Sequence, residues 1–218
     1  MRKSSHLFAI LALSFFAQTA FAAVTVEIDK VKDKSLLASF SSTVLVCEGV
    51  NSSVDLQWNS SLTKSTGSPT TQSAAMIVSL RYTNTCTGDD ITMTGFSLTP
   101  NGSEQADLSH AHVDAVVPVS TDPTLGPQLT ANVTVNLNFV ASGPASTVRN
   151  QSHSRDGGVL TVNDFSISSR PAVANGTVSG TLPLKAGPMF VNLVSGPSVS
   201  AQIGKDANGT IIITRKTK

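Results

Sequence analysis

The segment from Leu129 to Phe139 alternates strictly between apolar and polar residues. Its apolar members are Leu129, Ala131, Val133, Val135, Leu137 and Phe139, and the residues between them are Thr130, Asn132, Thr134, Asn136 and Asn138. Successive side chains of a β-strand point to opposite faces of the sheet, so this segment predicts a long strand with one buried and one solvated face. The pattern is typical of antiparallel sheets, because strands of a parallel sheet covered on both sides are apolar on both faces.

Shorter alternating runs along the chain predict further strands. The expected strands are residues 24–28, 36–47, 54–58, 76–84, 91–98, 108–119, 159–168, 172–184, 199–203 and 211–214. Turn-forming runs such as Pro100-Asn101-Gly102 separate them, and no stretch of a dozen residues has helical periodicity. These features predict an all-β fold, an antiparallel β-sandwich of immunoglobulin-like or jelly-roll-like type, as a single domain over residues 23–218.

Three local features follow from the positions of glycine and serine. The hydrophobic phase of residues 91–98 changes at Gly95, which predicts a β-bulge. Asn208-Gly209 predicts a hairpin turn between the last two strands. The stretch 60–73 is rich in Ser, Thr and Gly and predicts a loop.

Residues 1–22 have the composition of a secretory signal peptide. A basic start, Arg2-Lys3, is followed by the apolar run 7–17 and by small residues at Ala20 and Ala22, before the expected cleavage site. The apolar run is shorter than the roughly 20 residues that a membrane-spanning helix needs. We therefore expect a secreted protein, extracellular or periplasmic, with no transmembrane segment after cleavage.

The two cysteines, Cys47 and Cys86, both lie beyond the expected cleavage site. Two thiols in an oxidising compartment usually pair, so the sequence predicts one disulfide bond. The bridge would close a loop of about 40 residues, and the chain-entropy model gives it about 4 kcal/mol of stabilisation.

The charge of the chain is almost balanced. The sequence has 15 Lys and Arg against 14 Asp and Glu, and loss of Arg2 and Lys3 with the signal peptide leaves 13 against 14. Nucleic-acid-binding proteins carry an excess of positive charge, so nucleic acid is not expected as a partner.

The run His110-Ala111-His112-Val113-Asp114 is the sharpest local motif. On a strand, residues two apart point to the same face, so His110, His112 and Asp114 would project together, and His153 would join them from a distant loop. Two imidazoles and a carboxylate suit zinc, and the motif resembles the His-x-His-x-Asp of metallo-β-lactamase-like hydrolases. The alternative interpretation is a polar, solvent-facing strand face. In that case no cofactor is expected.

A second cluster of charged residues lies between two expected strands. Arg149, His153 and Arg155 belong to it, and Arg170 follows the second strand. Arg binds carboxylate and phosphate groups through two parallel hydrogen bonds, so the cluster is a candidate loop for an anion or a partner. A surface loop with ordinary solvated charges is the alternative.

Three resemblances bear on the function. Residues 138–144, His153 and residues 170–176 together resemble a region found in a group of uncharacterised secreted bacterial proteins, which spans about 40 residues and implies no activity. Cys47, Trp58 and Cys86 resemble the immunoglobulin core, in which a Trp packs on a disulfide. The single disulfide and β-sandwich pattern are similar to those of chaperone-assembled fimbrial subunits, although their penultimate Tyr has no counterpart here.

We expect a secreted structural or binding protein of the bacterial cell envelope or exterior, without catalytic activity or catalytic residues. Its partner would be an unknown protein or a cell-surface glycan. A metal-dependent hydrolase or metal-binding protein that uses His110, His112 and Asp114 is one alternative. A fimbria-like adhesive subunit is the other.

Overall fold

The computed structural model describes residues 24–45, 49–194 and 196–215, and their regular secondary structure consists of antiparallel strands, as the alternation predicts. The expected signal peptide and Cys47 lie outside the described residues. The strands are β1 (Val24–Val44), β2 (Val50–Ser65), β3 (Thr71–Asn84), β4 (Asp89–Ser97), β5 (Asn101–Glu104), β6 (His110–Ser120), β7 (Thr130–Ala141), β8 (Ser146–Asp156), β9 (Val159–Leu184), β10 (Gly187–Asn192) and β11 (Ser200–Arg215).

The sheet closes on itself through its hydrogen bonds. Its strands follow the order β9, β11, β1, β2, β3, β4, β6 and β7, and β7 pairs again with β9. The weakest link of this ring is the contact between β4 and β6, which has two residue pairs. Among the described strands, β5 pairs with β6, while β8 and β10 each pair with β9.

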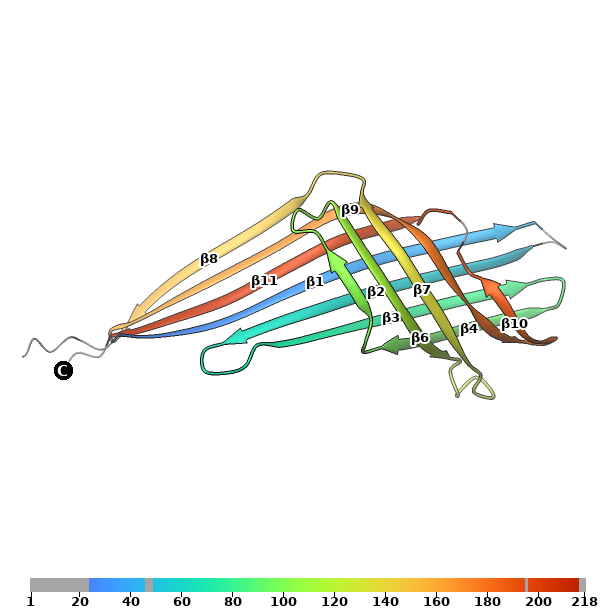
Figure 1. Cartoon of the computed structure of the whole chain (residues 1–218), viewed down its shortest axis with the longest axis horizontal. Coiled ribbons are helices and arrows are strands. Elements are labelled where there is room, and N and C mark those ends of the chain that lie inside the picture. Colours follow the sequence, from blue (N-terminus) through green and yellow to red (C-terminus); the bar gives the residue numbers. More distant parts are fainter. Residues whose placement is uncertain (1–23, 46–48, 195, 216–218) are drawn as a thin grey trace, which may run out of the picture.

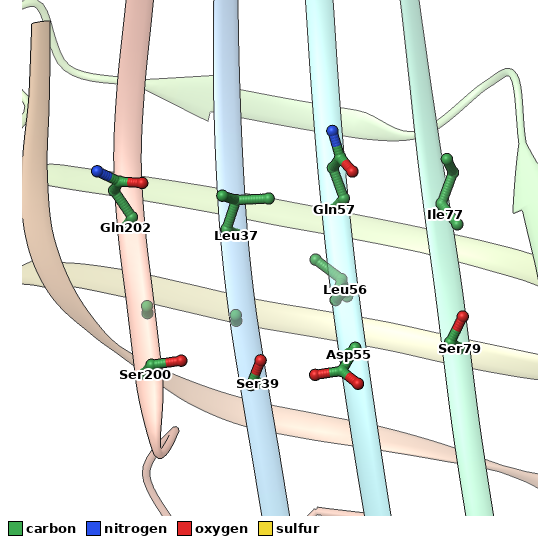
Figure 2. Close-up of a pocket in the computed structure, with 11 residues that line it drawn as sticks. Leu37, Ser39, Asp55, Leu56, Gln57, Ile77, Ser79, Ser200 and Gln202 are labelled. Carbon is green, nitrogen blue, oxygen red and sulfur yellow. The ribbon is translucent and has the colours of Figure 1, made fainter.

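The hydrophobic core lies where the ring folds over into two layers. Strands β11, β1, β2 and β3 run side by side, and strands of the other layer cross them at a steep angle (Figures 1 and 2). The largest fully buried side chains include Trp58, Phe139, Leu36 and Met76. We call this two-layered part the body.

Strand β7 is the clearest example of how the sequence forms the body. Val133, Val135, Leu137 and Phe139 are completely buried, and the residues between them are exposed. The predicted strand and its two faces are therefore confirmed from residue 130 onward. Leu129 is an exception, because it precedes the strand and is 37% exposed.

Gly95 does not form a bulge, so that prediction is wrong. The pairing of β3 with β4 runs through Val78 and Gly95 without interruption, and the buried and exposed positions keep their alternation. A Cβ atom on Gly95 would lie 1.9 Å from the carbonyl oxygen of Pro118 on β6. Glycine is needed here because the backbones of β4 and β6 approach each other closely where the ring closes.

Strands β1, β2, β9 and β11 continue beyond the body and form, together with β8, a single-layered sheet (Figure 1). We call this extension the blade and define it as residues 24–34 of β1, 60–65 of β2, 146–156 (all of β8), 159–169 of β9 and 204–215 of β11, with residues 71–74 of β3 at its edge. Every residue of β8 is exposed, and residues 159–162 of β9 are all half-buried. Neither pattern has the alternation that a covering second layer produces.

The blade corrects three sequence expectations. Asn208-Gly209 is not a hairpin turn, because β11 passes straight through it while paired with β1 and β9. Most of the expected loop 60–73 belongs to β2 and β3, and the expected loop around Arg149 is β8. Such segments are polar because, apart from buried residues next to the body such as Ser168, neither face of the blade is covered, and backbone pairing holds them in strands.

No described residue belongs to a helix that is both long and apolar enough to span a bilayer.

Candidate binding surface

The blade has two faces of opposite charge. Side chains alternate along each strand, and the registers of the neighbouring strands then decide which residues share a face. Leu36 of β1 and Ile203 of β11 are a buried pair in the body, so the residues that continue their positions into the blade lie on the same side as the body's second layer. The residues between them lie on the outer side.

We call the side of the blade that continues the positions of Leu36 and Ile203 the cationic face. Its charged residues on the described strands are Lys30, Lys32, Lys34, Lys64, Arg149, Arg155 and Lys205, with Asp164 as the one anion. Arg149 and Asp164 form a bidentate ion pair, in which Arg149 Nε lies 3.0 Å from Asp164 Oδ1 and Arg149 Nη2 lies 2.9 Å from Asp164 Oδ2. These hydrogen bonds lower the pKa of the Asp164 carboxyl below its ordinary value.

The opposite side is the acidic face. Its charged residues on the described strands are Glu27, Asp29, Asp33, Asp156 and Asp206, and it carries no Lys or Arg there. Asp33 and Asp206 lie directly opposite each other on β1 and β11. Partial burial and then the neighbouring Asp33 carboxylate raise the pKa of Asp206.

Like charges also face each other on the cationic face. Lys30 is the register partner of Lys64, and Lys34 is the register partner of Lys205. Like charges directly opposite each other in a sheet are destabilising. The blade therefore keeps pairs of charges that cost stability in the isolated protein.

Apolar residues cover the cationic face toward the free end of the blade. Val24 and Val26 of β1 are 55% and 45% exposed, and Ile28 continues the same row. Ile211 and Ile213 are the register partners of Ile28 and Val26 on β11. The next strand, β9, adds Leu160 and Val162. In this apolar tip Val24 and Val26 are exposed to solvent, and the other five residues are half-buried.

A hollow of about 210 Å³ lies between the apolar tip and the root of the cationic face. Lys30 and Lys32 line one side, Val162 and Asp164 line the other, and Ala207 and Gly209 lie between them on β11. The two small residues leave the space that larger side chains would fill.

We call the end of the cationic face that adjoins the body, around Lys34, Lys205 and Arg170, its root. There these three side chains donate hydrogen bonds to backbone carbonyl groups of the body. Lys34 Nζ donates to the carbonyl oxygen of Glu104 at 3.4 Å, and Lys205 Nζ donates to that of Ala106. Arg170 donates to Gly143 O at 2.7 Å and to Asp107 O at 3.2 Å. These contacts attach the β5–β6 connection, and through Gly143 the β7–β8 connection, to the strands that run into the blade.

Glu104 lies within this junction and is half-buried. Burial raises the pKa of its carboxyl to about 7, although Lys34 and Lys205 act in the opposite direction. Its Oε2 and the indole Nε1 of Trp58 are buried without a hydrogen-bond partner in the described part of the chain. The junction therefore holds an anion that is poorly compensated at neutral pH.

The outer side of the body carries a shallow groove of about 460 Å³ (Figure 2). Gln202, Leu37, Gln57 and Ile77 form one row across β11, β1, β2 and β3. Ser200, Ser39, Asp55 and Ser79 form the next row, as Figure 2 shows. This surface is continuous with the acidic face, because both consist of the outward positions of the same strands.

His110, His112 and Asp114 lie on β6 and share its outward face, as the spacing predicts. His112 Nδ1 is 2.9 Å from Asn138 Oδ1, and its Nε2 is 3.4 Å from Asp114 Oδ1. His153 lies on the blade instead, on a strand that pairs with β9. The described residues contain no group of three or more His, Cys, Asp or Glu side chains arranged to hold a metal ion. The zinc site remains a prediction without structural support.

The four residues of the predicted anion-binding loop lie in two different places. Arg149, His153 and Arg155 occupy alternate positions of β8, so all three lie on the cationic face. Arg170 lies apart from them at the root, where its guanidinium is bonded to two backbone carbonyls. The structure thus brings three of the four residues together, on a strand instead of a loop.

Sequence reasoning missed the lysines that complete the cationic face. The run Glu27-Ile28-Asp29-Lys30-Val31-Lys32-Asp33-Lys34 places its acids at odd positions and its lysines at even positions. On a strand, this pattern separates the two signs onto opposite faces. The alternation of negative and positive residues, and not an alternation of hydrophobicity, is the sequence signal that would have predicted these two faces.

The disulfide prediction remains open, because Cys47 lies outside the described residues.

The chain matches no family model, and neither a curated protein nor a solved structure matches it. The resemblance of residues 138–176 to secreted bacterial proteins therefore stays an expectation.

Proposed function

We propose that the protein is a non-catalytic structural or binding protein that works outside the cytoplasm, at the bacterial cell envelope or exterior, and that the blade is its interaction surface. The observation that carries the proposal is the exposed apolar tip on a single-layered sheet. Large exposed apolar surfaces on soluble proteins are typical of sites for protein or membrane partners.

The charges of the blade support the same function. They are spread in rows over several strands, which suits the recognition of an extended surface better than the conversion of a small substrate. The expected signal peptide supports a location beyond the cytoplasmic membrane.

We also infer the finer details of the fold that the sequence predicts. The crossing layers of the body support a β-sandwich. The backbone amide of Thr85 donates to Gly49 O at 3.2 Å, and Val50 pairs with Asn84, so the segments that lead to Cys47 and Cys86 are adjacent. This adjacency supports the proposed disulfide.

The proposal is tested by disrupting the tip without changing the body. In a bacterium that produces the protein, the double variant Val24→Glu/Val26→Glu should be released from the envelope or assembled fraction into the soluble fraction. Val116→Glu is the matched control, since Val116 is a 58% exposed valine on β6 of the body. Circular dichroism and thermal unfolding should show that all three proteins are folded. If the double variant fractionates like the wild type, the blade is not the interaction surface.

The outer groove favours a second candidate function, the binding of a cell-surface glycan. Asp55, Gln57 and Gln202 provide hydrogen-bonding groups beside apolar Leu37 and Ile77, and a concave surface that combines apolar residues with a few polar groups is the usual composition of a small-ligand site. On a glycan array, Asp55→Ala should abolish any binding that the wild type shows, while Asp29→Ala should leave it intact. Equal binding by both variants would exclude the groove.

A further inference from the structure

We propose that the partner of the blade is a second copy of the same chain, with the cationic face of one copy lying on the acidic face of the next. This inference rests on the proposed function, because it takes the blade to be the interaction surface. It deepens that function by naming the occupant.

Charge complementarity is the first argument. The cationic face carries seven cations and one anion, whereas the acidic face carries five anions and no Lys or Arg on the described strands. Contact between two identical faces would bring like charges together, which costs free energy. Contact between the two different faces brings opposite charges together.

The register of the strands is the second argument. Lys30 faces Lys64, Lys34 faces Lys205, and Asp33 faces Asp206 within each sheet. Each of these pairs is repulsive in the isolated chain. Lys34 and Lys205 already lie beside the Glu104 carboxyl, so a covering surface of opposite sign would add counter-charges to the other two pairs, Lys30 with Lys64 and Asp33 with Asp206.

The size of the blade is the third argument. Eleven-residue strand segments with a rise of about 3.3 Å per residue and a spacing of about 4.8 Å give each face a footprint of roughly 800 Å². A stable protein interface buries about 800 Å² on each partner. One blade face is therefore large enough for a specific contact.

Shape also favours contact between different faces. The second layer of the body lies on the side of the cationic face, and no other described strand covers the acidic face along the length of the sheet. Phe165 and Ile167 project from the acidic face and are 38% and 40% exposed. The hollow of about 210 Å³ on the cationic face offers space for an apolar side chain of this kind.

A contact between different faces leaves one free face of each kind at the two ends of the dimer. Heterologous contacts of this type continue into rings or open chains of subunits. The expected product is thus a linear or ring-shaped assembly, and its formation should be weakened by salt, which screens the charges.

The test begins with the purified mature protein and sedimentation velocity. At low ionic strength the wild type should form concentration-dependent assemblies that dissociate in high salt. The variant Lys30→Glu/Lys32→Glu/Arg155→Glu alters the cationic face, and the variant Glu27→Lys/Asp29→Lys/Asp33→Lys alters the acidic face. Each variant alone should associate roughly 100-fold more weakly, because about three charge pairs are lost.

Mixing the two variants provides the decisive measurement. The second variant keeps a native cationic face and the first keeps a native acidic face, so the mixture should associate strongly although each variant alone does not. The two altered faces also carry opposite charges, so the mixed assembly can continue beyond a 1:1 complex. Misfolding would not give this result. Circular dichroism of each variant serves as the folding control.

The inference is overturned if the folded variants do not pair on mixing, or if the wild type stays monomeric at every concentration and salt tested. A monomer that sediments with phosphatidylglycerol vesicles and not with phosphatidylcholine vesicles would identify an anionic membrane as the partner and overturn self-assembly. In these cases release of the Val24→Glu/Val26→Glu variant would still support the proposed function, so the two failures are distinguishable.

Discussion

Replacement of Glu104 by Gln should stabilise the protein above neutral pH and leave its stability unchanged in acid. The folded protein raises the pKa of this carboxyl from 4.5 to about 7, mainly through burial. The folded state therefore binds the proton more tightly than the unfolded chain. The associated stability is fully present below pH 4.5 and is lost as the pH rises through about 7.

The magnitude follows from the shift of the pKa and from the exposure of the side chain. A shift of this size corresponds to about 3 kcal/mol at 1.36 kcal/mol per pKa unit. Glu104 is only half-buried, so solvent screening reduces the expected effect to about 1–2 kcal/mol. Glu104→Gln removes the buried charge, and the variant should be more stable than the wild type by that amount at pH 8.

Urea unfolding of both proteins from pH 4 to pH 9 measures the effect as a difference in free energy of unfolding. Other titrating groups are common to both proteins and cancel in this difference. Glu27→Gln changes an exposed glutamate and is the matched control for the substitution itself. If the stability difference between Glu104→Gln and the wild type were the same at pH 4 and pH 8, the assignment of a costly buried charge to Glu104 would be refuted.

Three further predictions concern two strands of the body and the proposed disulfide. Val135→Asp places a carboxylate at a fully buried position and should lower the free energy of unfolding in urea by about 3–5 kcal/mol. Thr134→Asp, on the exposed face, should lower it by less than about 0.5 kcal/mol. Equal shifts of the two unfolding midpoints would contradict the register of β7. Gly95→Ala should lower stability by about 2 kcal/mol, because its Cβ atom would lie 1.9 Å from a backbone oxygen of β6. An unchanged thermal midpoint would contradict the close approach of β4 and β6 at this position. Titration of the denatured, unreduced mature protein should find no free thiol if Cys47 and Cys86 are bridged, and two titratable thiols would end that proposal.

The body could be predicted from the sequence because burial imposes alternation on it. Val133, Val135 and Leu137 point to the core, and the polar residues between them point to water, so each position reports its own environment. Gly95 was misassigned because a glycine within a strand indicates either a bulge or a close backbone approach. Only the position of β6 decides between the two.

The blade could not be predicted in the same way. Both faces of β8 are exposed, so hydrophobicity has no period there, and its polar sequence is that of a loop. The pairing of residues 24–34 with 205–215 is also a contact between the two ends of the described chain. The near-neutral total charge hid the cationic face, because equal numbers of opposite charges give the same sum however they are distributed.

The continuity of β1, β9 and β11 from the body into the blade has a mechanical consequence. None of the three strands is interrupted at the junction, so the described chain has no connecting loop there that could act as a hinge. Ladder hydrogen bonds run across the strands. A pull along the blade therefore loads many of these bonds in parallel and carries the force directly into the hydrophobic core, whereas a pull across it would peel the edge strand β8 away one bond at a time. The molecule should resist tension best in the direction in which its longest strands run.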